Sequence, residues 1–234
     1  VLGRFTEPTR AWFTGAFEAP TPAQLGAWDA ISSGRHALVI APTGSGKTLS
    51  SFLWALDSFV REPAAEGTAA TRVLYVSPLK ALGVDVERNL RAPLVGITQT
   101  AAHQGRPVPR VRVGVRSGDT PAAERRRLQQ DPPDILITTP ESLYLMLTSQ
   151  ARAALAGVRT VIVDEVHAVA GTKRGAHLAV SLERLDALLD APVQRIGLSA
   201  TVEPAAEVAR FLGGTQPVTV VRLSLIHISE PTRQ

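Results

Sequence analysis

Residues 37–48 read Ala-Leu-Val-Ile-Ala-Pro-Thr-Gly-Ser-Gly-Lys-Thr. The apolar run Ala37–Ile40 is followed by a glycine-rich loop and then by helical spacing through Val60, so we expect a strand, a loop and a helix in that order. The loop fits the Walker A pattern, except that Ala41 stands where the strict form has glycine. Such a loop turns backbone N–H groups toward phosphates at the start of a helix. The sequence therefore predicts a nucleotide-phosphate site in an α/β fold.

Each residue of this loop has an expected role. The cradle for the phosphates is expected to comprise Thr43, Gly44, Ser45 and Gly46. Lys47 should reach the β- and γ-phosphates and so take part in catalysis, while the Thr48 hydroxyl should join the shell of a Mg²⁺ ion. The alternative is a glycine-rich turn that binds nothing, but strand, loop and helix follow in the order that phosphate binding requires. We therefore expect a nucleoside triphosphate and Mg²⁺ as the ligands of this loop.

Short apolar runs rich in Val, Ile and Leu recur along the chain, separated by segments with helical spacing. The runs are Ala37–Ile40, Val73–Ser77, Val111–Val115, Ile135–Thr138, Thr160–Val163, Ile196–Leu198 and Val218–Val221. The helical segments are Lys47–Val60, Ala81–Leu94, Pro121–Gln129, Ser142–Thr148, Ala176–Leu189 and Ala205–Leu212. This alternation predicts one α/β domain with a mostly parallel sheet and helices on both faces. Ligands of such folds bind at the carboxyl ends of the strands. Two stretches rich in Ala, Gly, Pro and polar residues are expected to be surface insertions, namely Glu62–Thr71 and Thr100–Arg110.

Two carboxylates end one of these strands, in the run Thr-Val-Ile-Val-Asp-Glu-Val-His at residues 160–167. We expect them to face Thr48 across neighbouring strands. Asp164 is placed to hold Mg²⁺, through water, and Glu165 to act as the general base that polarises the attacking water. His167 alone would be read as an ordinary surface histidine, but its spacing after the two acids favours a functional role.

A second polar strand end is Ser199-Ala200-Thr201, which follows the strand through Leu198. Hydroxyl groups at such a position often cap the next helix. After an Asp-Glu-Val-His run, however, we expect Ser199 and Thr201 to bond with the acidic segment. With His167 they would couple the nucleotide site to a nucleic-acid face.

Six segments in this order resemble the motif series of superfamily 2 helicases. They are Phe17–Gln24, the loop Ala41–Thr48, Ser77–Leu82, Thr139–Ser142, Asp164–His167 and Ser199–Thr201. The chain is similar in particular to the large helicase-related (Lhr) family, through Thr9–Phe13, Val84–Leu90, Val115–Thr120 and Gly171–His177. The resemblance covers residues 1–222 and implies a RecA-like P-loop NTPase domain, the first of two motor domains.

The resemblance also implies function. It suggests ATP-driven 3′-to-5′ translocation on single-stranded DNA or RNA, with duplex unwinding and a role in DNA repair. Gln24 should read adenine, because a side-chain amide can donate and accept along the N6/N7 edge. The residues expected to line a strand track through phosphate contacts are Pro78, Lys80, Ser117, Gly118, Asp119, Thr139, Pro140, Glu141 and Ser142.

Composition is compatible with these expectations but does not decide them. The 234 residues carry a formal net charge of +4, with a sequence pI near 10.1. There is no cysteine, hence no disulfide. No run approaches the roughly 18 apolar residues of a membrane span, and no signal peptide is seen, so we expect an intracellular, cytoplasmic protein. Arg125, Arg126 and Arg127 are expected to form a solvated helix face, and Trp12, Trp28 and Trp54 to be packing residues.

The end of the chain is expected to be foreign to the fold. Residues 223–234 resemble the translation of a common transposon-based sequencing adapter, so we expect the natural domain to stop near Arg222, inside a longer gene. A second motor domain would then supply the arginine that stabilises transition-state charge, without which ATP binding should be weak and hydrolysis slow. The alternatives are a duplex translocase or remodelling ATPase, and a stand-alone nucleotide or nucleic-acid binding module.

Overall fold

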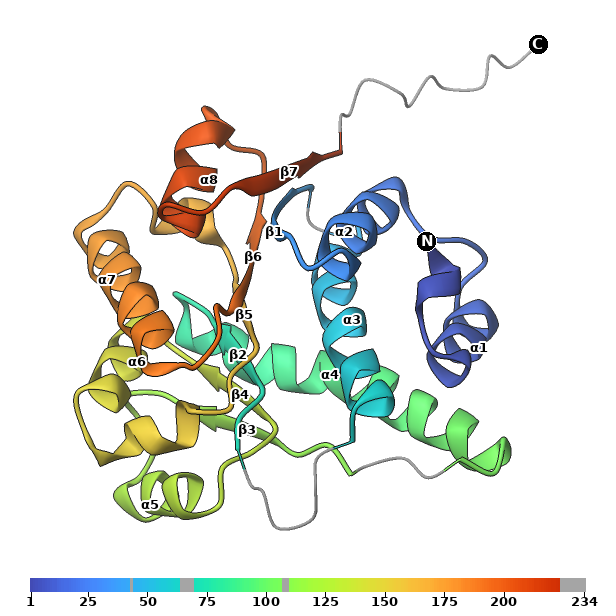
Figure 1. The fold of residues 1–234 in the computed structure, drawn as a ribbon, viewed down its shortest axis with the longest axis horizontal. Coiled ribbons are helices and arrows are strands. Elements are labelled where there is room, and N and C mark those ends of the chain that lie inside the picture. The colour runs from blue at the N-terminus through green and yellow to red at the C-terminus, as the bar shows by residue number, and fades with distance from the viewer. Residues whose placement is uncertain (43, 64–69, 107–109, 224–234) are drawn as a thin grey trace.

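A single seven-stranded sheet forms the centre of the molecule in a computed structural model that describes residues 1–42, 44–63, 70–106 and 110–223 (Figure 1). All six pairings between neighbouring strands are parallel, and the order across the sheet is β3-β4-β2-β5-β6-β1-β7. The strands are β1 His36–Ile40, β2 Val73–Val76, β3 Val113–Arg116, β4 Ile135–Thr138, β5 Thr160–Val163, β6 Gln194–Ser199 and β7 Val218–Arg222. The predicted α/β class with a parallel sheet is confirmed.

The inner strands β1, β2, β4 and β5 are largely apolar and buried, because helices cover both faces of the sheet. In β1, Ala37 and Val39 join one hydrophobic cluster, while Leu38 and Ile40 join the other. Successive side chains of a strand point to opposite faces, so a run without polar interruption is needed when neither face meets water. This physical requirement is why the strands were recognisable from sequence.

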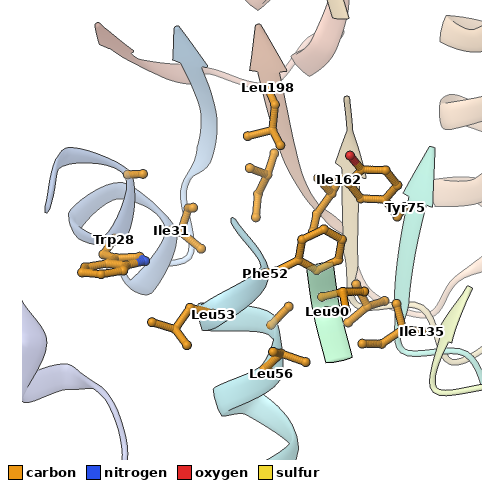
Figure 2. Packing of buried hydrophobic residues seen from close by; sticks show 14 of the residues in the cluster. Trp28, Ile31, Phe52, Leu53, Leu56, Tyr75, Leu90, Ile135, Ile162 and Leu198 are labelled. Carbon is orange, nitrogen blue, oxygen red and sulfur yellow. The ribbon is translucent and has the colours of Figure 1, made fainter. Parts of the chain in front are cut away.

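The first face is covered by the amino-terminal helices (Figure 1). They are α1 Glu7–Ala16, α2 Pro22–Ser32, α3 Lys47–Arg61 and α4 Lys80–His103, preceded by the 3-10 turn η1 Leu2–Arg4. Trp28 of α2 and Phe52 of α3 are buried in this cluster, together with Tyr75 and Ile162 of the sheet (Figure 2). Trp12 and Trp54 pack against the same cluster, so the tryptophans are packing residues, as expected.

The opposite face is covered by the later helices (Figure 1). They are α6 Pro140–Leu147, α7 Lys173–Leu188 and α8 Ala205–Gly213, with the 3-10 turns η2 Gln150–Leu155 and η3 Val166–Ala168. A further helix, α5 Ala122–Gln130, follows β3. Both α6 and α7 begin earlier than predicted, because the Thr139 and Thr172 hydroxyls accept hydrogen bonds from backbone N–H groups and cap the helices. Among the described residues, no helix combines the length and the apolar character needed to cross a bilayer.

The expected surface insertion at Thr100–Arg110 is wrong in its first part. Helix α4 does not end near Leu94 but continues to His103, with Pro93 inside it and Ala101 fully buried. Trp12 of α1 packs so closely on Gly96 that an added Cβ would lie 2.0 Å from its ring nitrogen. Packing on α1 offsets the loss of the backbone hydrogen bond that proline removes from a helix. Residues 107–109 lie outside the described part.

The other expected insertion, Glu62–Thr71, lies largely outside the described part, which omits residues 64–69. Its last residue is not on the surface, since Thr71 is fully buried and its hydroxyl donates to the Pro133 carbonyl at 2.9 Å. The segment expected to be foreign, 223–234, is described only at Leu223, whose N–H donates to the Ile40 carbonyl at 3.0 Å.

Candidate nucleotide site and nucleic-acid track

The predicted phosphate loop joins β1 to α3 at the carboxyl edge of the sheet. Gly44 and Gly46 have φ of +82° and +80°, a backbone conformation that side-chain-bearing residues rarely adopt. Ser45 closes the turn, because its hydroxyl donates to the Pro42 carbonyl at 2.7 Å. Thr43 lies outside the described residues. The two glycines therefore let the chain turn sharply before Lys47 begins the helix.

Gln24 lies against this loop, as the adenine-reading hypothesis requires. Its side-chain oxygen accepts the Thr21 N–H at 2.9 Å in the cap of α2, and the Thr21 hydroxyl donates to the Ser45 carbonyl at 3.1 Å. An added Cβ on Gly46 would lie 2.6 Å from the Gln24 amide nitrogen. The buried amide is thus fixed beside the loop, although its part in reading a base stays a prediction.

Lys47 meets Glu165 across the sheet edge. The Lys47 side chain is 7% exposed, and its Nζ lies 3.9 Å from Glu165 Oε1 and 3.4 Å from the Ala41 carbonyl oxygen. We expected the acids and the phosphate loop to follow neighbouring strands. This is wrong, since β6 lies between β1 and β5. Long side chains span this extra strand, and so the ammonium group and the proposed general base still come together.

Asp164, at the end of β5, is held by two hydrogen bonds. Its Oδ1 accepts the Glu165 N–H at 2.9 Å, and its Oδ2 accepts the hydroxyl of Tyr75 from β2. Burial, and next the negative charge of Asp164, raise the pKa of Tyr75 far above its ordinary value, so the hydroxyl keeps its proton and is the donor. Sequence reasoning missed Tyr75, because a tyrosine in an apolar strand gives no signal beyond packing.

Glu165 has an unusual backbone conformation. Its φ of 45° and ψ of 41° are left-handed, and it is the one non-glycine residue with positive φ among the described residues. Left-handed conformation in a non-glycine residue costs about 1–3 kcal/mol and is concentrated at functional sites. The turn separates the neighbouring acids: Asp164 stays buried under the strand end, and the Glu165 carboxylate reaches Lys47 and His167.

His167 connects Glu165 to the segment after β6. Its Nε2 lies 3.3 Å from Glu165 Oε2, and its Nδ1 accepts the Ala200 N–H at 3.3 Å, with the Ser199 hydroxyl 3.2 Å away. Because a backbone N–H can only donate, Nδ1 carries no proton, and the neutral ring therefore directs an Nε2–H at Glu165. The structure thus brings His167 and Ser199 together, whereas Thr201 is exposed and contributes no contact to this set.

The oxygen donors near the loop suit a magnesium ion. Mg²⁺ retains several waters and takes one or two carboxylates plus phosphate oxygens, without a dedicated protein cage. Among the described residues there is no group of three or more acidic, histidine or cysteine side chains that could hold a metal. Asp164 offers an ionisable carboxylate and Thr48, half-buried in the first turn of α3, offers a hydroxyl. This sparse set of hard donors fits Mg²⁺ accompanied by a nucleotide.

The expected track residues follow β2, β3 and β4, which are adjacent in the sheet. Pro78 lies after β2, Lys80 begins α4 with its side chain outside the described part, and Thr139–Ser142 opens α6. Because all strands are parallel, these loops lie at the same edge as those of the nucleotide half, β5, β6 and β1. The topology therefore places the expected track residues and the expected nucleotide residues at different parts of one edge, with β2 and β5 adjacent at the boundary.

An arginine that was not among the predicted site residues connects two of the segments expected to form the track. Arg174 at the start of α7 donates to Glu141 Oε1 at 2.7 Å and to the Pro78 carbonyl at 3.0 Å. The hydrogen bond with Arg174 is the main cause that lowers the pKa of Glu141, and Glu141 in turn raises the pKa of Arg174. Glu141 was expected to face phosphate, but its carboxylate is engaged with this cation. The segment Gly171–His177 was the one sequence signal that could have indicated Arg174.

The turn after β3 is organised by its own hydroxyl groups. The Ser117 N–H donates to the Thr120 hydroxyl at 2.8 Å, and the Asp119 N–H donates to the Ser117 hydroxyl at 3.3 Å. Gly118 and Asp119 are exposed. The three arginines of α5 were expected to form a solvated face, and this is wrong for Arg125. Its side chain is half-buried, and its Nε donates to the Thr120 carbonyl at 2.8 Å. Arg126 and Arg127 are exposed.

The chain is similar to known proteins over most of its length. The family model described as DEAD/DEAH box helicase matches residues 21–209. The chain is 69% identical over 220 residues to "Lhr helicase/ probable uracil glycosylase" of Mycolicibacterium smegmatis, covering 94% of the chain and 14% of that relative. It is 61% identical over 222 residues to "Lhr helicase/uracil glycosylase" of Escherichia coli, covering 93% and 14%. The chain thus spans only a small part of these relatives.

Solved structures show the same fold. Helicase Lhr of Mycobacterium smegmatis bound to ssDNA and AMP-PNP matches with a TM-score of 0.90 at 67% identity, over 95% of this chain and 28% of that chain. The DEAD-box helicase Mss116 bound to ssRNA and UDP-BeF matches with a TM-score of 0.77 at 17% identity, over 94% and 44%. The second likeness supports the fold alone.

Proposed function

The chain belongs to the DEAD/DEAH box helicase family, and we propose that it is the ATP-binding first motor domain of a helicase similar to Lhr. The observation that carries this proposal is the approach of Lys47 to Glu165 beside a phosphate loop, with His167 linking Glu165 to Ala200. ATP hydrolysis coupled to 3′-to-5′ translocation and unwinding, with a role in DNA repair, is proposed for the whole protein. Support comes from relatives of which this chain spans 14%.

For nucleotide binding, the chain would use its own backbone and Lys47. The N–H groups at the start of α3 offer donors and partial positive charge to the phosphates. Lys47 is held at 3.9 Å from Glu165 and would exchange this carboxylate for phosphate oxygens. Thr48 and Asp164 would hold Mg²⁺, which neutralises charge on the phosphates when bound. Gln24, fixed against Gly46, would contact the base.

For hydrolysis, Glu165 would orient and deprotonate the attacking water once Lys47 has turned to the phosphates. The Nε2–H of His167 would keep one carboxylate oxygen oriented, leaving the other free for water. Nδ1 of the same ring accepts the Ala200 N–H, so a movement of the loop after β6 would move the ring and with it the Glu165 carboxylate. This chain of contacts supports the proposed coupling role of His167 and Ser199.

For nucleic acid, the loops after β2, β3 and β4 would hold the phosphates of one strand. The relative helicase Lhr of known structure is bound to ssDNA. Contacts through small hydroxyls and backbone N–H groups position a strand without reading its sequence. We propose that residues 1–222 form this motor domain and that a second one in the full-length chain supplies the missing arginine.

The proposal is tested by nucleotide binding to this chain. Titration with a fluorescent ATP analogue and Mg²⁺ should show saturable binding that Lys47→Ala weakens by at least tenfold, because a charged contact to phosphate is lost. Lys173→Ala is the matched control, since that lysine is exposed on α7. No binding by the unaltered chain, or equal binding by Lys47→Ala, would overturn the proposal.

A further inference from the structure

We propose that Tyr75 is a positioning residue for the magnesium–nucleotide site: its hydroxyl fixes the Asp164 carboxylate in the orientation that receives the metal. The inference rests on the proposed function, since it assigns Asp164 to Mg²⁺. It concerns a side chain of the β2 strand that lies at the boundary between the nucleotide half and the track half of the sheet.

Tyr75 is held rigidly before it meets Asp164. It lies in β2 opposite Ile162 of β5, and its side chain is fully buried. Its ring stacks on Phe52 of α3, with centroids 4.9 Å apart and planes 21° from parallel (Figure 2). The ring therefore lies between the sheet and α3, the helix that begins with Lys47. The hydroxyl therefore has a fixed position relative to both.

The bonds of Asp164 leave a defined part of its carboxylate for a ligand. An ionised carboxylate has about four acceptor positions. The Tyr75 hydroxyl occupies one on Oδ2, and the Glu165 N–H occupies one on Oδ1. Rotation of the carboxylate would break both bonds, and the residue is only 6% exposed. Counting donors among the described residues alone, one acceptor position on each oxygen thus remains, with its direction set by protein donors.

Such outer donors matter for metal binding. Groups that orient a metal ligand change metal affinity by about 10- to 100-fold when they are removed. A buried tyrosine hydroxyl also needs an acceptor for reasons of stability alone. The two roles differ in their consequences. Loss of a purely structural bond changes the free energy of unfolding by the same amount with and without metal. Loss of a positioning bond changes how nucleotide affinity depends on the Mg²⁺ concentration.

The test removes the hydroxyl and keeps the ring. Tyr75→Phe preserves the stack on Phe52, and Tyr144→Phe on α6 is a matched control, because these are the two tyrosines of the chain. Affinity for a fluorescent ATP analogue is measured in EDTA and over a series of Mg²⁺ concentrations. For Tyr75→Phe we expect an unchanged nucleotide affinity in EDTA. The Mg²⁺ concentration that gives half of the maximal gain in nucleotide affinity should rise by at least about tenfold. Tyr144→Phe should match the unaltered chain.

An unchanged Mg²⁺ dependence of Tyr75→Phe would overturn the inference while leaving the proposed function intact. A lack of nucleotide binding by the unaltered chain would overturn both. A second measurement needs no change at Tyr75: in Tyr144→Phe, Tyr75 is the sole tyrosine, and selective ¹³C labelling reports its ring by NMR. Its resonances should shift with Mg²⁺–nucleotide and not with nucleotide in EDTA, and equal shifts in both would overturn the inference.

Discussion

The Nζ atom of Lys47 lies 3.9 Å from Oε1 of Glu165. One residue begins α3 after β1 and the other follows β5, and β6 separates these strands in the sheet. The lysine side chain is 7% exposed and that of Glu165 is 26% exposed, so the attraction between them is only partly screened by water. The acid thus serves as the partner of a buried cation. Phosphate would compete with Glu165 for this cation.

In the full-length protein, Glu165→Gln should separate binding from hydrolysis. The amide keeps the size of the side chain and cannot accept a proton, so phosphate release should fall by about 10²- to 10⁴-fold, the usual contribution of a general base. Nucleotide affinity should be kept or should rise, because the competing carboxylate beside Lys47 is removed. Glu207→Gln on the exposed face of α8 is the control. Normal turnover in Glu165→Gln would refute the assignment.

Gly46→Ala should abolish nucleotide binding. The residue has φ of +80°, and an added Cβ would lie 2.6 Å from the Gln24 amide nitrogen. The left-handed conformation costs about 1–2 kcal/mol for a residue with a side chain, and relief would move the loop or Gln24. Nucleotide titration and thermal unfolding give the two readouts. Gly15→Ala, in α1 with open space around it, should bind nucleotide normally, and normal binding by Gly46→Ala would contradict the proposed cradle.

In the full-length protein, His167→Ala should uncouple Glu165 from the segment that follows β6. The contacts of the ring with Glu165 and Ala200 would both be lost, while the phosphate loop is untouched. We expect nucleotide affinity within about twofold of normal and a loss of any stimulation of ATP hydrolysis by single-stranded nucleic acid. Hydrolysis is measured with and without an oligonucleotide, with His103→Ala, an exposed residue at the end of α4, as the control. Retained stimulation would show that coupling takes another route.

Glu141→Gln gives a decisive test of the track. Removal of a negative charge would strengthen phosphate binding if charge alone mattered. If Glu141 instead holds Arg174 on the Pro78 carbonyl, affinity for a single-stranded oligonucleotide should fall, by about fivefold for a bond worth roughly 1 kcal/mol. Fluorescence anisotropy at several salt concentrations measures the effect. Tighter binding would contradict the positioning role.

A control for this pair is available on α8, where Glu207 and Arg210 form an exposed ion pair of similar length. Glu207→Gln should leave oligonucleotide affinity unchanged. Because both side chains of the Glu141–Arg174 pair are 47–55% exposed, its loss should change the free energy of unfolding by no more than about 1 kcal/mol. A large loss of stability in Glu141→Gln would indicate a structural role instead.

Much of the fold was predictable because its signals are local. Parallel strands covered on both faces must be apolar throughout, which made β1, β4 and β5 visible as continuous runs. The phosphate loop was equally visible, since the left-handed turns at Gly44 and Gly46 need glycine. Helix α4 was the main error: its second half depends on Trp12 from α1, and a partner so distant in sequence leaves no local pattern.

By itself, the sequence determined the α/β class, the phosphate loop and the identity of the acids that follow β5. Only the tertiary structure decided which side chains meet. It placed β6 between the lysine and acid strands, directed the Tyr75 hydroxyl to Asp164, and engaged Glu141 with Arg174. The physical reason is that residue type and periodicity fix backbone conformation and burial locally. A hydrogen bond between distant strands depends instead on the order and register that packing selects.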